Sequence, residues 1–208
     1  MCKRLGILTA INMIKIAIII GSTRPNRNGE AVAKWVYENT QTRNDATFEL
    51  VDIKDYNLPL LDEPMPPSIG HYSEEHTKIW SEKIASFDGY IFVTPDYNRS
   101  VPAALKNAID FLYNEWTNKA AGFVGYSGNG SVRAIENLRI IMSELQIADV
   151  RSQVNLSLMT DFKNFREFNP APFHLGILMN MIDQVIAWGR LLKDFRAKQT
   201  TTIADYSE

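Results

Sequence analysis

Cysteine is almost absent from this sequence, with Cys2 the only one among 208 residues. One cysteine cannot close an intramolecular disulfide, and it cannot provide the ligands of a zinc cluster. Proteins without disulfides are typical of reducing compartments, so we expect a cytoplasmic location. Cys2 itself lies beside the chain start, where we expect no reactive role for it.

A strong net charge is also absent. Lysine and arginine together number 22, aspartate and glutamate number 24, and the formal net charge is −2. This balance leaves no general basic surface, so we do not expect nucleic acid as a partner.

Long apolar segments are missing as well. No apolar run approaches the roughly 20 residues that a membrane-spanning helix needs, so we expect no membrane partner. Residues 1–12 combine a basic start with a short apolar patch, but they have no A-x-A-like cleavage site, which argues against a secretory signal. Met13 directly precedes the first strand pattern, so we treat residues 1–12 as an N-terminal extension that we expect to be flexible.

Several motifs of catalysis and nucleotide binding are missing too. The sequence has neither the GxxxxGK[ST] motif of P-loop NTPases nor the GxGxxG motif of dinucleotide-binding folds. The histidines His71, His76 and His174 form no HExxH pattern, and we expect each to be a surface or capping residue. We therefore expect no metal site.

What the sequence does contain is a regular alternation of strand and helix patterns. Five short apolar segments predict strands at Ile14–Ile20, Phe48–Ile53, Gly89–Thr94, Ala120–Tyr126 and Val150–Leu158. Helical patterns follow them, from about Asn28 to Asn39 and at Ser73–Ser86, Val101–Tyr113, Val132–Leu145 and Phe173–Ala197. The connections Lys54–Gly70 and Asp161–Pro172 predict irregular structure.

This alternation predicts a three-layer α/β protein, in which a five-stranded parallel sheet is covered by helices on both faces. Five strands favour the flavodoxin-like order 2-1-3-4-5. Ligands then bind between strands one and three, outside the carboxyl ends of the strands. The sequence has no internal repeat, so we expect a single domain over residues 13–198, with a flexible tail at 199–208.

Helical periodicity also predicts which residues face the core and where helices begin. Ala31 and Trp35 are expected to face inward in the first helix, and Ile79 and Trp80 in the second. Ser100 is the expected N-cap of the third helix.

The loop after the first strand has the properties of a phosphate site. Gly21 ends the strand, and Ser22, Arg24, Arg27 and Asn28 then offer hydrogen-bond donors just before a helix begins. The helix N-terminus adds free backbone N–H groups and the positive end of the helix dipole. We expect one terminal phosphate here, with Ser22 and Arg24 as the main side-chain donors. The alternative is an ordinary polar turn that caps a helix.

Two further loops are expected to meet the phosphate loop at the same sheet edge. After strand three, Tyr97 offers an aromatic face, and the backbone N–H groups of Asp96 to Asn98 could meet the polar edge of a planar heterocycle. After strand four, three glycines would let the backbone approach a flat ligand, namely Gly125, Gly128 and Gly130. Each loop alone could be an ordinary turn, but the three together suit a mononucleotide such as FMN.

Two stretches and the glycine-rich turn resemble a known family. The sequences GSTRPNRNGEAVAKWV and TPDYNRSVPAALKNAIDFL, with the turn before RAIENLR, are similar to the NAD(P)H-dependent FMN reductase family over roughly Lys15 to Leu158. This family has a flavodoxin-like fold and includes quinone, azo-dye and chromate reductases. The resemblance implies a bound FMN, with NADPH or NADH as co-substrate.

The resemblance also implies which residues hold the cofactor. The FMN phosphate would lie on Ser22, Arg24, Arg27 and Asn28. The ring would contact one group of residues in the second loop and another in the third, namely Pro95, Asp96, Tyr97 and Asn98, and Ser127 and Gly128. The sequence departs from the family pattern at Ser131, where glycine is usual, and at Asp96, where glutamate is more frequent.

The implied activity is that of an oxidoreductase in which FMN carries the hydride, so we expect no catalytic side chain. Electrons would pass from NAD(P)H to FMN and then to a quinone, azo, flavin or metal-oxyanion acceptor, in a ping-pong mechanism. One alternative is a flavodoxin-like electron carrier without nicotinamide activity, but the charge of −2 and the presence of Arg24 and Arg27 favour the reductase. Another alternative is a non-catalytic phosphate-binding or redox-sensing module.

The last helix pattern is too apolar for one buried stripe. Apolar residues between Leu175 and Phe195 cover more than half of its circumference, whereas a surface helix normally has a narrower apolar face. We therefore expect part of this helix to form the interface of a homodimer or homotetramer. The family resemblance points the same way and implies that FMN lies near the interface.

Overall fold

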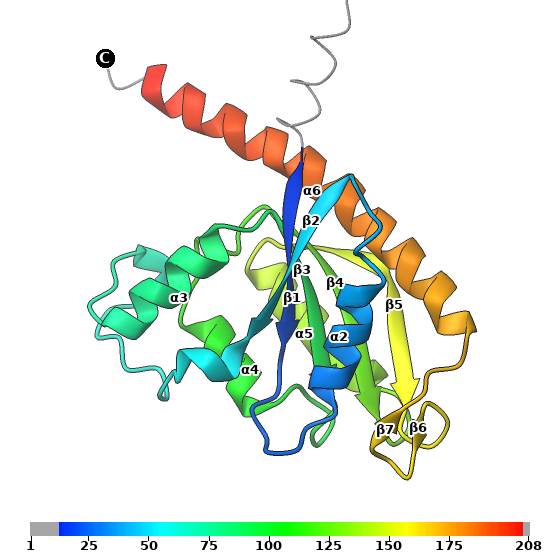
Figure 1. Cartoon of the computed structure of the whole chain (residues 1–208). Coiled ribbons are helices and arrows are strands. Elements are labelled where there is room, and N and C mark those ends of the chain that lie inside the picture. Colours follow the sequence, from blue (N-terminus) through cyan, green and yellow to red (C-terminus); the bar gives the residue numbers. More distant parts are fainter. Residues whose placement is uncertain (1–12, 206–208) are drawn as a thin grey trace, which may run out of the picture.

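The computed structural model describes residues 13–205, with side chains as far as Gln199, so Cys2 and the N-terminal extension lie outside the described residues. A single five-stranded sheet organises the described chain (Figure 1). Its strands are β1 (Ile14–Ile20), β2 (Ala46–Asp52), β3 (Gly89–Pro95), β4 (Ala120–Ser127) and β5 (Ala148–Ser157). All pairs are parallel and the order is β2-β1-β3-β4-β5, which confirms the predicted flavodoxin-like architecture.

Helices cover both faces of the sheet. Within residues 13–205 the helices are α2 (Gly29–Glu38), α3 (Glu75–Ala85), α4 (Ala103–Asp110), α5 (Val132–Glu144) and α6 (Phe173–Asp205). Buried residues of α2 and α6 share one hydrophobic cluster, and those of α3, α4 and α5 share the other. Two short 3₁₀ turns, η1 (Ile53–Tyr56) and η2 (Pro67–Ile69), lie in the proline-rich connection. The predicted three-layer arrangement is therefore confirmed.

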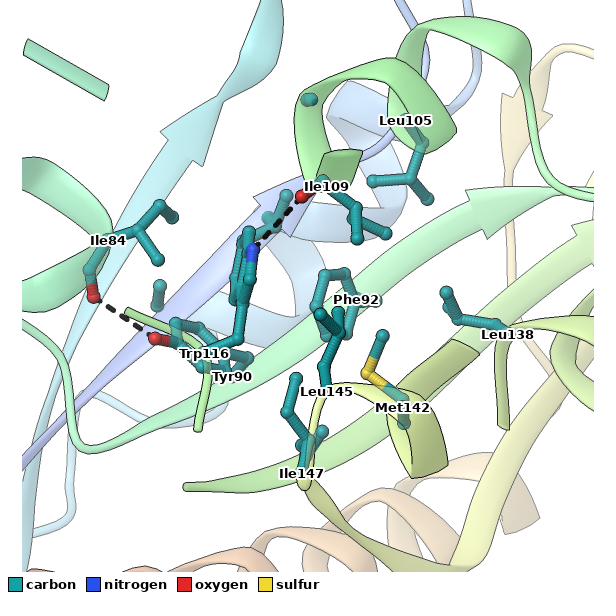
Figure 2. Close-up of a cluster of buried hydrophobic side chains, with 14 of the residues drawn as sticks. Ile84, Tyr90, Phe92, Leu105, Ile109, Trp116, Leu138, Met142, Leu145 and Ile147 are labelled. Atoms are coloured by element: carbon teal, nitrogen blue, oxygen red, sulfur yellow. Dashed lines mark hydrogen bonds between the residues drawn. The ribbon is translucent and has the colours of Figure 1, made fainter. Parts of the chain in front are cut away.

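The core under α3, α4 and α5 is rich in large aromatic side chains (Figure 2). The Trp116 indole N–H donates to the Ile109 carbonyl at 3.1 Å, and the Tyr90 hydroxyl donates to the Ile84 carbonyl at 3.1 Å. Ile84 and Ile109 lie in the last turns of α3 and α4, where backbone carbonyls have no partner within the helix. The buried aromatics therefore satisfy their own polar atoms and fix two helix ends to the sheet.

Some details of the helices differ from the sequence predictions. Ala31 and Ile79 are exposed rather than buried, because α2 starts at Gly29 and turns Ala33 inward, and α3 turns Trp80 inward. The predicted N-cap was also wrong. Pro102 precedes α4, which begins at Ala103 without a side-chain cap.

The connection after β5 was predicted to be irregular, but it contains a small antiparallel hairpin. Its strands are β6 (Phe162–Lys163) and β7 (Glu167–Phe168). Two aromatic contacts hold it, since the Phe162 ring lies 6.4 Å from that of Tyr126 and the Phe168 ring lies 5.7 Å from that of Trp35. Strands of two residues have no periodicity that sequence reasoning could detect, so tertiary packing decides their formation.

Helix α6 is longer than predicted and extends beyond the sheet (Figure 1). Its segment Phe173–Gln199 is long and apolar enough to cross a membrane by length and composition only, a test that a helix packed on a protein core also passes. Its most buried residues pack against the sheet, namely Leu178, Met181, Ile182, Val185 and Ile186. Core packing therefore accounts for much of its apolar character.

Candidate functional site

Three loops lie at the carboxyl ends of β1, β3 and β4, along one edge of the sheet. The Gly21 N–H donates to the Val93 carbonyl at 2.9 Å, which holds the start of the first loop against β3. The Ser22 hydroxyl lies 3.3 Å from the Tyr97 hydroxyl. The fold therefore brings together side chains from the first and second loops that lie 75 positions apart in the sequence.

Arg27 is committed to the protein itself. Its Nε and Nη2 lie 3.0 and 2.7 Å from Glu30 Oε1, and its Nη1 lies 3.0 Å from Asp52 Oδ1. Nη1 also donates to the Ser22 carbonyl, and Nη2 donates to Asp52 Oδ2. A guanidinium has five N–H donors, so these bonds leave none for a phosphate.

The electrostatics of Arg27 agree with this commitment. Its side chain is 3% exposed. Burial by itself lowers the pKa of Arg27, but the hydrogen bonds and charges of Asp52 and Glu30 outweigh burial and raise it. Arg27 therefore shapes the loop by tying it to the end of β2 and the first turn of α2, although the sequence placed it among the phosphate donors.

Arg24 differs sharply from Arg27. It is exposed, and its guanidinium lies over the Tyr97 ring at 5.8 Å from the centroid. Among residues 13–199 it forms no ion pair. Its backbone N–H approaches the Ser22 hydroxyl at 3.5 Å. Arg24 and Ser22 therefore place a free cation and a hydroxyl together beside the N-terminus of α2, as anion binding requires.

The N-terminus of α2 is held from two sides. The Asn28 amide donates to the Phe165 carbonyl in the hairpin at 2.9 Å, so this predicted phosphate donor also has a structural partner. The Gly29 backbone is hydrogen-bonded to the Tyr126 hydroxyl, and a Cβ at Gly29 would lie 2.7 Å from that oxygen. Burial raises the pKa of Tyr126, which keeps the phenol protonated under the helix end. A larger residue at this position would have to displace the buried Tyr126 ring.

The second loop is a tight turn. The Tyr97 N–H donates to the Ser100 carbonyl at 2.8 Å, and the Ser100 N–H donates back at 3.1 Å. Asn98 and Arg99 both have positive φ, 55° and 72°, and Asp96 Oδ1 accepts from the Arg99 N–H at 2.9 Å. The Tyr97 N–H was expected to meet a heterocycle edge, but the turn uses it.

In the third loop, one of the three glycines predicted to face a ligand packs against the protein instead. A Cβ at Gly125 would lie 2.3 Å from the Ser131 Cβ, so this glycine allows α5 to approach β4 rather than admitting a ligand. Ser131, which stands where the family usually has glycine, is fully buried and donates to the Thr94 carbonyl at 3.4 Å. Gly128 faces open space, because a Cβ added there would have no atom within 4 Å.

A recess of about 220 Å³ lies where the second and third loops meet. It is lined by Asp96 from one loop and by Ser127, Gly128, Asn129, Gly130 and Arg133 from the other. The Ser127 hydroxyl donates to the Gly130 carbonyl and the Ser157 hydroxyl donates to that of Gly128 at 3.1 Å, so the backbone of the turn is fixed. The recess therefore joins three predicted ring-contact residues in one concave surface.

Sequence reasoning missed several residues that build this site. Glu30 could have been found, because it stands three positions after Arg27 in a helix and can reach it. Asp52, Tyr126 and Phe165 come from distant elements, and no local signal links them to the loop.

The histidines lie apart from these loops. His174 is 4% exposed and its Nε2 lies 3.1 Å from Asp161 Oδ1, so of the two expected roles, surface or capping residue, the surface role was wrong. Burial raises the pKa of Asp161, but N–H donors from Ala171 and Ser157 outweigh it and hold the pKa below its ordinary value. This pair closes the connection between β5 and α6.

His76 belongs to an exposed group of possible metal ligands. One ligand atom each from Asp62, Glu74 and His76 lies within 4.8 Å of the others. His76 Nε2 and Asp62 Oδ1 are 2.9 Å apart and already satisfy one another. The group lies in and after the proline-rich connection, away from the three loops.

Comparisons with known proteins identify the family of this chain. The family model of the NADPH-dependent FMN reductases matches residues 14–161. An NAD(P)H-dependent FMN reductase of Schizosaccharomyces pombe is 40% identical over 149 residues, covering 71% of this chain and 74% of that protein. An FMN-dependent NADPH-azoreductase of Staphylococcus aureus is 33% identical over 182 residues, covering 84% and 95%.

A solved structure shares the fold. FerB, a flavoenzyme NAD(P)H:(acceptor) oxidoreductase from Paracoccus denitrificans, superposes with a TM-score of 0.64 at 20% identity, covering 85% of this chain and 97% of that one. At that identity the likeness concerns the fold alone. With the family model matching most of the chain, the loops and the relatives lead to one conclusion: the protein belongs to the NADPH-dependent FMN reductase family, and it is an oxidoreductase that uses FMN and NAD(P)H.

Proposed function

We propose that this protein transfers a hydride from NAD(P)H to bound FMN and then reduces a small-molecule acceptor in a separate half-reaction. The proposal depends mainly on the position and the unpaired charge of Arg24. Its guanidinium stacks on Tyr97 beside the Ser22 hydroxyl and the N-terminus of α2, and it has no ionic partner within the described chain. An unpaired cation in that position is suited to the terminal phosphate of a mononucleotide.

The residues present fit FMN at both of its ends. Ser22, Arg24 and the first N–H groups of α2 would hold the phosphate, and Arg27 and Asn28 would keep the loop in shape around it. The recess beside Asp96 would take the edge of the ring, with the fixed backbone of Ser127 and Gly128 as its wall. Pro95, Tyr97 and Asn98 would flank the ring on the side of the second loop.

The chain's own residues position and orient rather than transfer protons. FMN, when bound, supplies the hydride-accepting and electron-donating chemistry. The three loops supply fixed donors and flat surfaces, which hold two reactants in a productive arrangement. No histidine belongs to these loops among the described residues, and the Tyr126 phenol under α2 stays protonated. A ping-pong order follows if nicotinamide and acceptor use the same face of the ring in turn.

The acceptor is a small molecule of the quinone, azo, flavin or metal-oxyanion class. The recess at the ring-binding loops is shallow and partly open, so it places few steric demands on the acceptor. A relative named as an azoreductase supports an acceptor of this kind. We place the reaction in the cytoplasm, where NAD(P)H is available and where a chain with one cysteine needs no disulfide.

We further propose that the protein is a homodimer or homotetramer that assembles through α6. Three apolar side chains at helical spacing stay exposed on it after the sheet is covered, Trp188, Leu191 and Phe195, with exposed fractions of 47%, 70% and 45%. An exposed apolar stripe of this kind marks an association surface. Light scattering at micromolar concentration tests this, and a stable monomer contradicts it.

Anaerobic reduction tests the proposed reaction. The purified protein should bind FMN, and its flavin absorbance should bleach on addition of NADPH or NADH and return on addition of a quinone or azo acceptor. An FMN-loaded protein that neither nucleotide reduces would instead be an electron carrier. A protein that does not bind FMN contradicts both.

A further inference from the structure

A second cavity lies beside the phosphate loop, on the side away from the ring-binding recess. It measures about 340 Å³ and is enclosed by η1, by the segment that follows η1 and by α4. Its apolar lining consists of Ala104 and Ala108, one helical turn apart on α4, and of Ile53 and Leu58 from the segment after β2. Small and aliphatic side chains of this kind provide an apolar surface on which a planar ring can pack.

The mouth of this cavity is polar and faces the phosphate loop. Thr23, the residue before Arg24, forms part of its rim. Lys54 also lines it, is exposed, and forms no side-chain ion pair with any residue from 13 to 199. The cavity therefore has an unpaired ammonium and a hydroxyl in its lining, and the hydroxyl belongs to the residue before Arg24, a combination that suits a phosphate.

The walls of the cavity are fixed. The Asn107 amide donates to the Pro59 carbonyl at 2.6 Å and accepts from the Leu61 N–H at 3.0 Å, which pins the proline-rich segment to α4. Asp52 Oδ1 accepts from the Lys54 N–H at 3.0 Å and also binds Arg27. One carboxylate thus connects the cavity to the phosphate loop, so a ligand in the cavity has a fixed position relative to the FMN site.

We propose that this cavity holds the adenosine 5′-phosphate end of NAD(P)H, an inference that rests on the proposed function. The cavity and the ring-binding recess share no lining residue, so they are separate subsites at the same sheet edge as the phosphate loop. A ligand that uses both must be long, with a planar base at one end and phosphates between its ends. NAD(P)H has this form, with the base on the apolar lining and phosphate near Lys54 and Thr23.

Reduced nicotinamide mononucleotide, which lacks the adenosine phosphate, makes the test specific. In the FMN-loaded enzyme, Lys54→Gln should raise KM for NADPH about three- to tenfold by loss of one partly solvated phosphate contact. Ala104→Phe, which fills the cavity, should raise it at least as much. Neither variant should change KM for the mononucleotide or the affinity for FMN. Lys34→Gln, on the outer face of α2, is the matched lysine control.

Either of two results overturns the assignment. One is an unchanged KM for NADPH in both variants, and the other is a rise in KM for the mononucleotide as large as the rise for NADPH. Adenosine 5′-monophosphate should compete with NADPH in the wild type and lose potency in both variants, and its failure to compete also counts against the cavity. Failure of the proposed function looks different. In that case the wild-type FMN complex is not reduced by NADPH at all, and the cavity assignment fails with it.

Discussion

Among the described residues, charged side chains are paired at the amino edge of the sheet and mostly unpaired at the carboxyl edge. At the amino ends of the strands, Asp88 accepts from Lys193 Nζ at 2.9 Å and from Arg196 Nη2 at 2.7 Å. At the same edge, Lys119 is 5% exposed and donates to the Ile84 and Ala85 carbonyls, each at 3.1 Å. Every one of these charges has a partner within the fold.

At the carboxyl ends the cations are left free. In the described chain, Arg24, Arg99 and Arg133 form no ion pair, and all three lie on the loops after β1, β3 and β4 or just beyond them. Unpaired cations that converge at one edge add nothing to folding and attract anionic ligands. The difference supports our proposal that the carboxyl edge binds the cofactor, whereas the charges at the amino edge contribute to stability. Arg27 is the exception, since it lies at the binding edge but is fully paired like the residues of the other edge.

Replacement of Arg27 should have the largest effect. Arg27→Met leaves the Asp52 carboxylate without its partner at a mostly buried position, which should lower the free energy of unfolding by about 3–5 kcal/mol. Urea denaturation of the FMN-free protein measures this. Arg27→Met combined with Asp52→Leu should recover part of the loss, because no unpaired charge remains. Unchanged stability with lost FMN binding would mean that Arg27 serves as a ligand after all.

At the amino edge, Lys119 should make the free energy of unfolding depend on pH. Burial lowers the pKa of Lys119 to about 7 from an ordinary value of 10.5, and the charge of Arg196 adds to the shift. Between these two values the unfolded chain binds one more proton than the folded one, so the free energy of unfolding rises with pH. We expect a gain of about 2 kcal/mol between pH 7 and pH 9.

The control for this titration is Lys119→Met, which removes the ionisable group and should flatten the rise over the same range. Burial also holds the pKa of the neighbouring Tyr90 well above its ordinary value, so that hydroxyl does not titrate in this window. A wild-type protein that is equally stable at pH 7 and pH 9 contradicts the prediction.

Gly125 tests whether the third loop is shaped by packing. Gly125→Ala places a methyl group 2.3 Å from the Ser131 Cβ, and such overpacking should cost about 2 kcal/mol of unfolding free energy. Ser131→Gly removes the clashing carbon, so the double variant should be more stable than Gly125→Ala alone. The cycle can be measured without FMN, which separates packing from ligand contacts. Additive effects of the two substitutions would contradict direct contact.

The sequence predicted the fold well because its signals are local. Apolar runs such as Ile14–Ile20 and the glycine that ends them depend on neighbouring residues, and the observed strand has the predicted bounds. The sequence did not show which residues of each loop face a ligand and which bind other parts of the protein. Arg24 and Arg27 look alike in sequence, and Arg27 differs through its bonds to Glu30, one helical turn away, and to the distant Asp52. Gly125 and Gly128 likewise differ only through α5, which packs on one and leaves the other open.

Replacement of Arg24 should have the smallest effect on stability. Arg24→Gln removes a charge that is exposed and stacks only on Tyr97, so the free energy of unfolding should change by less than about 0.5 kcal/mol. The affinity for FMN should fall about tenfold through loss of one charge-assisted phosphate contact, measured by flavin fluorescence titration. Arg133→Gln is a control that also removes an unpaired arginine, but it lies at the ring-binding recess rather than at the phosphate loop. This variant should lower the affinity for FMN less than Arg24→Gln does. Added salt screens both arginines, so it should reduce the difference in affinity between the two variants. Equal losses in the two variants would mean that this edge attracts FMN only by its overall charge, without a specific phosphate contact at Arg24.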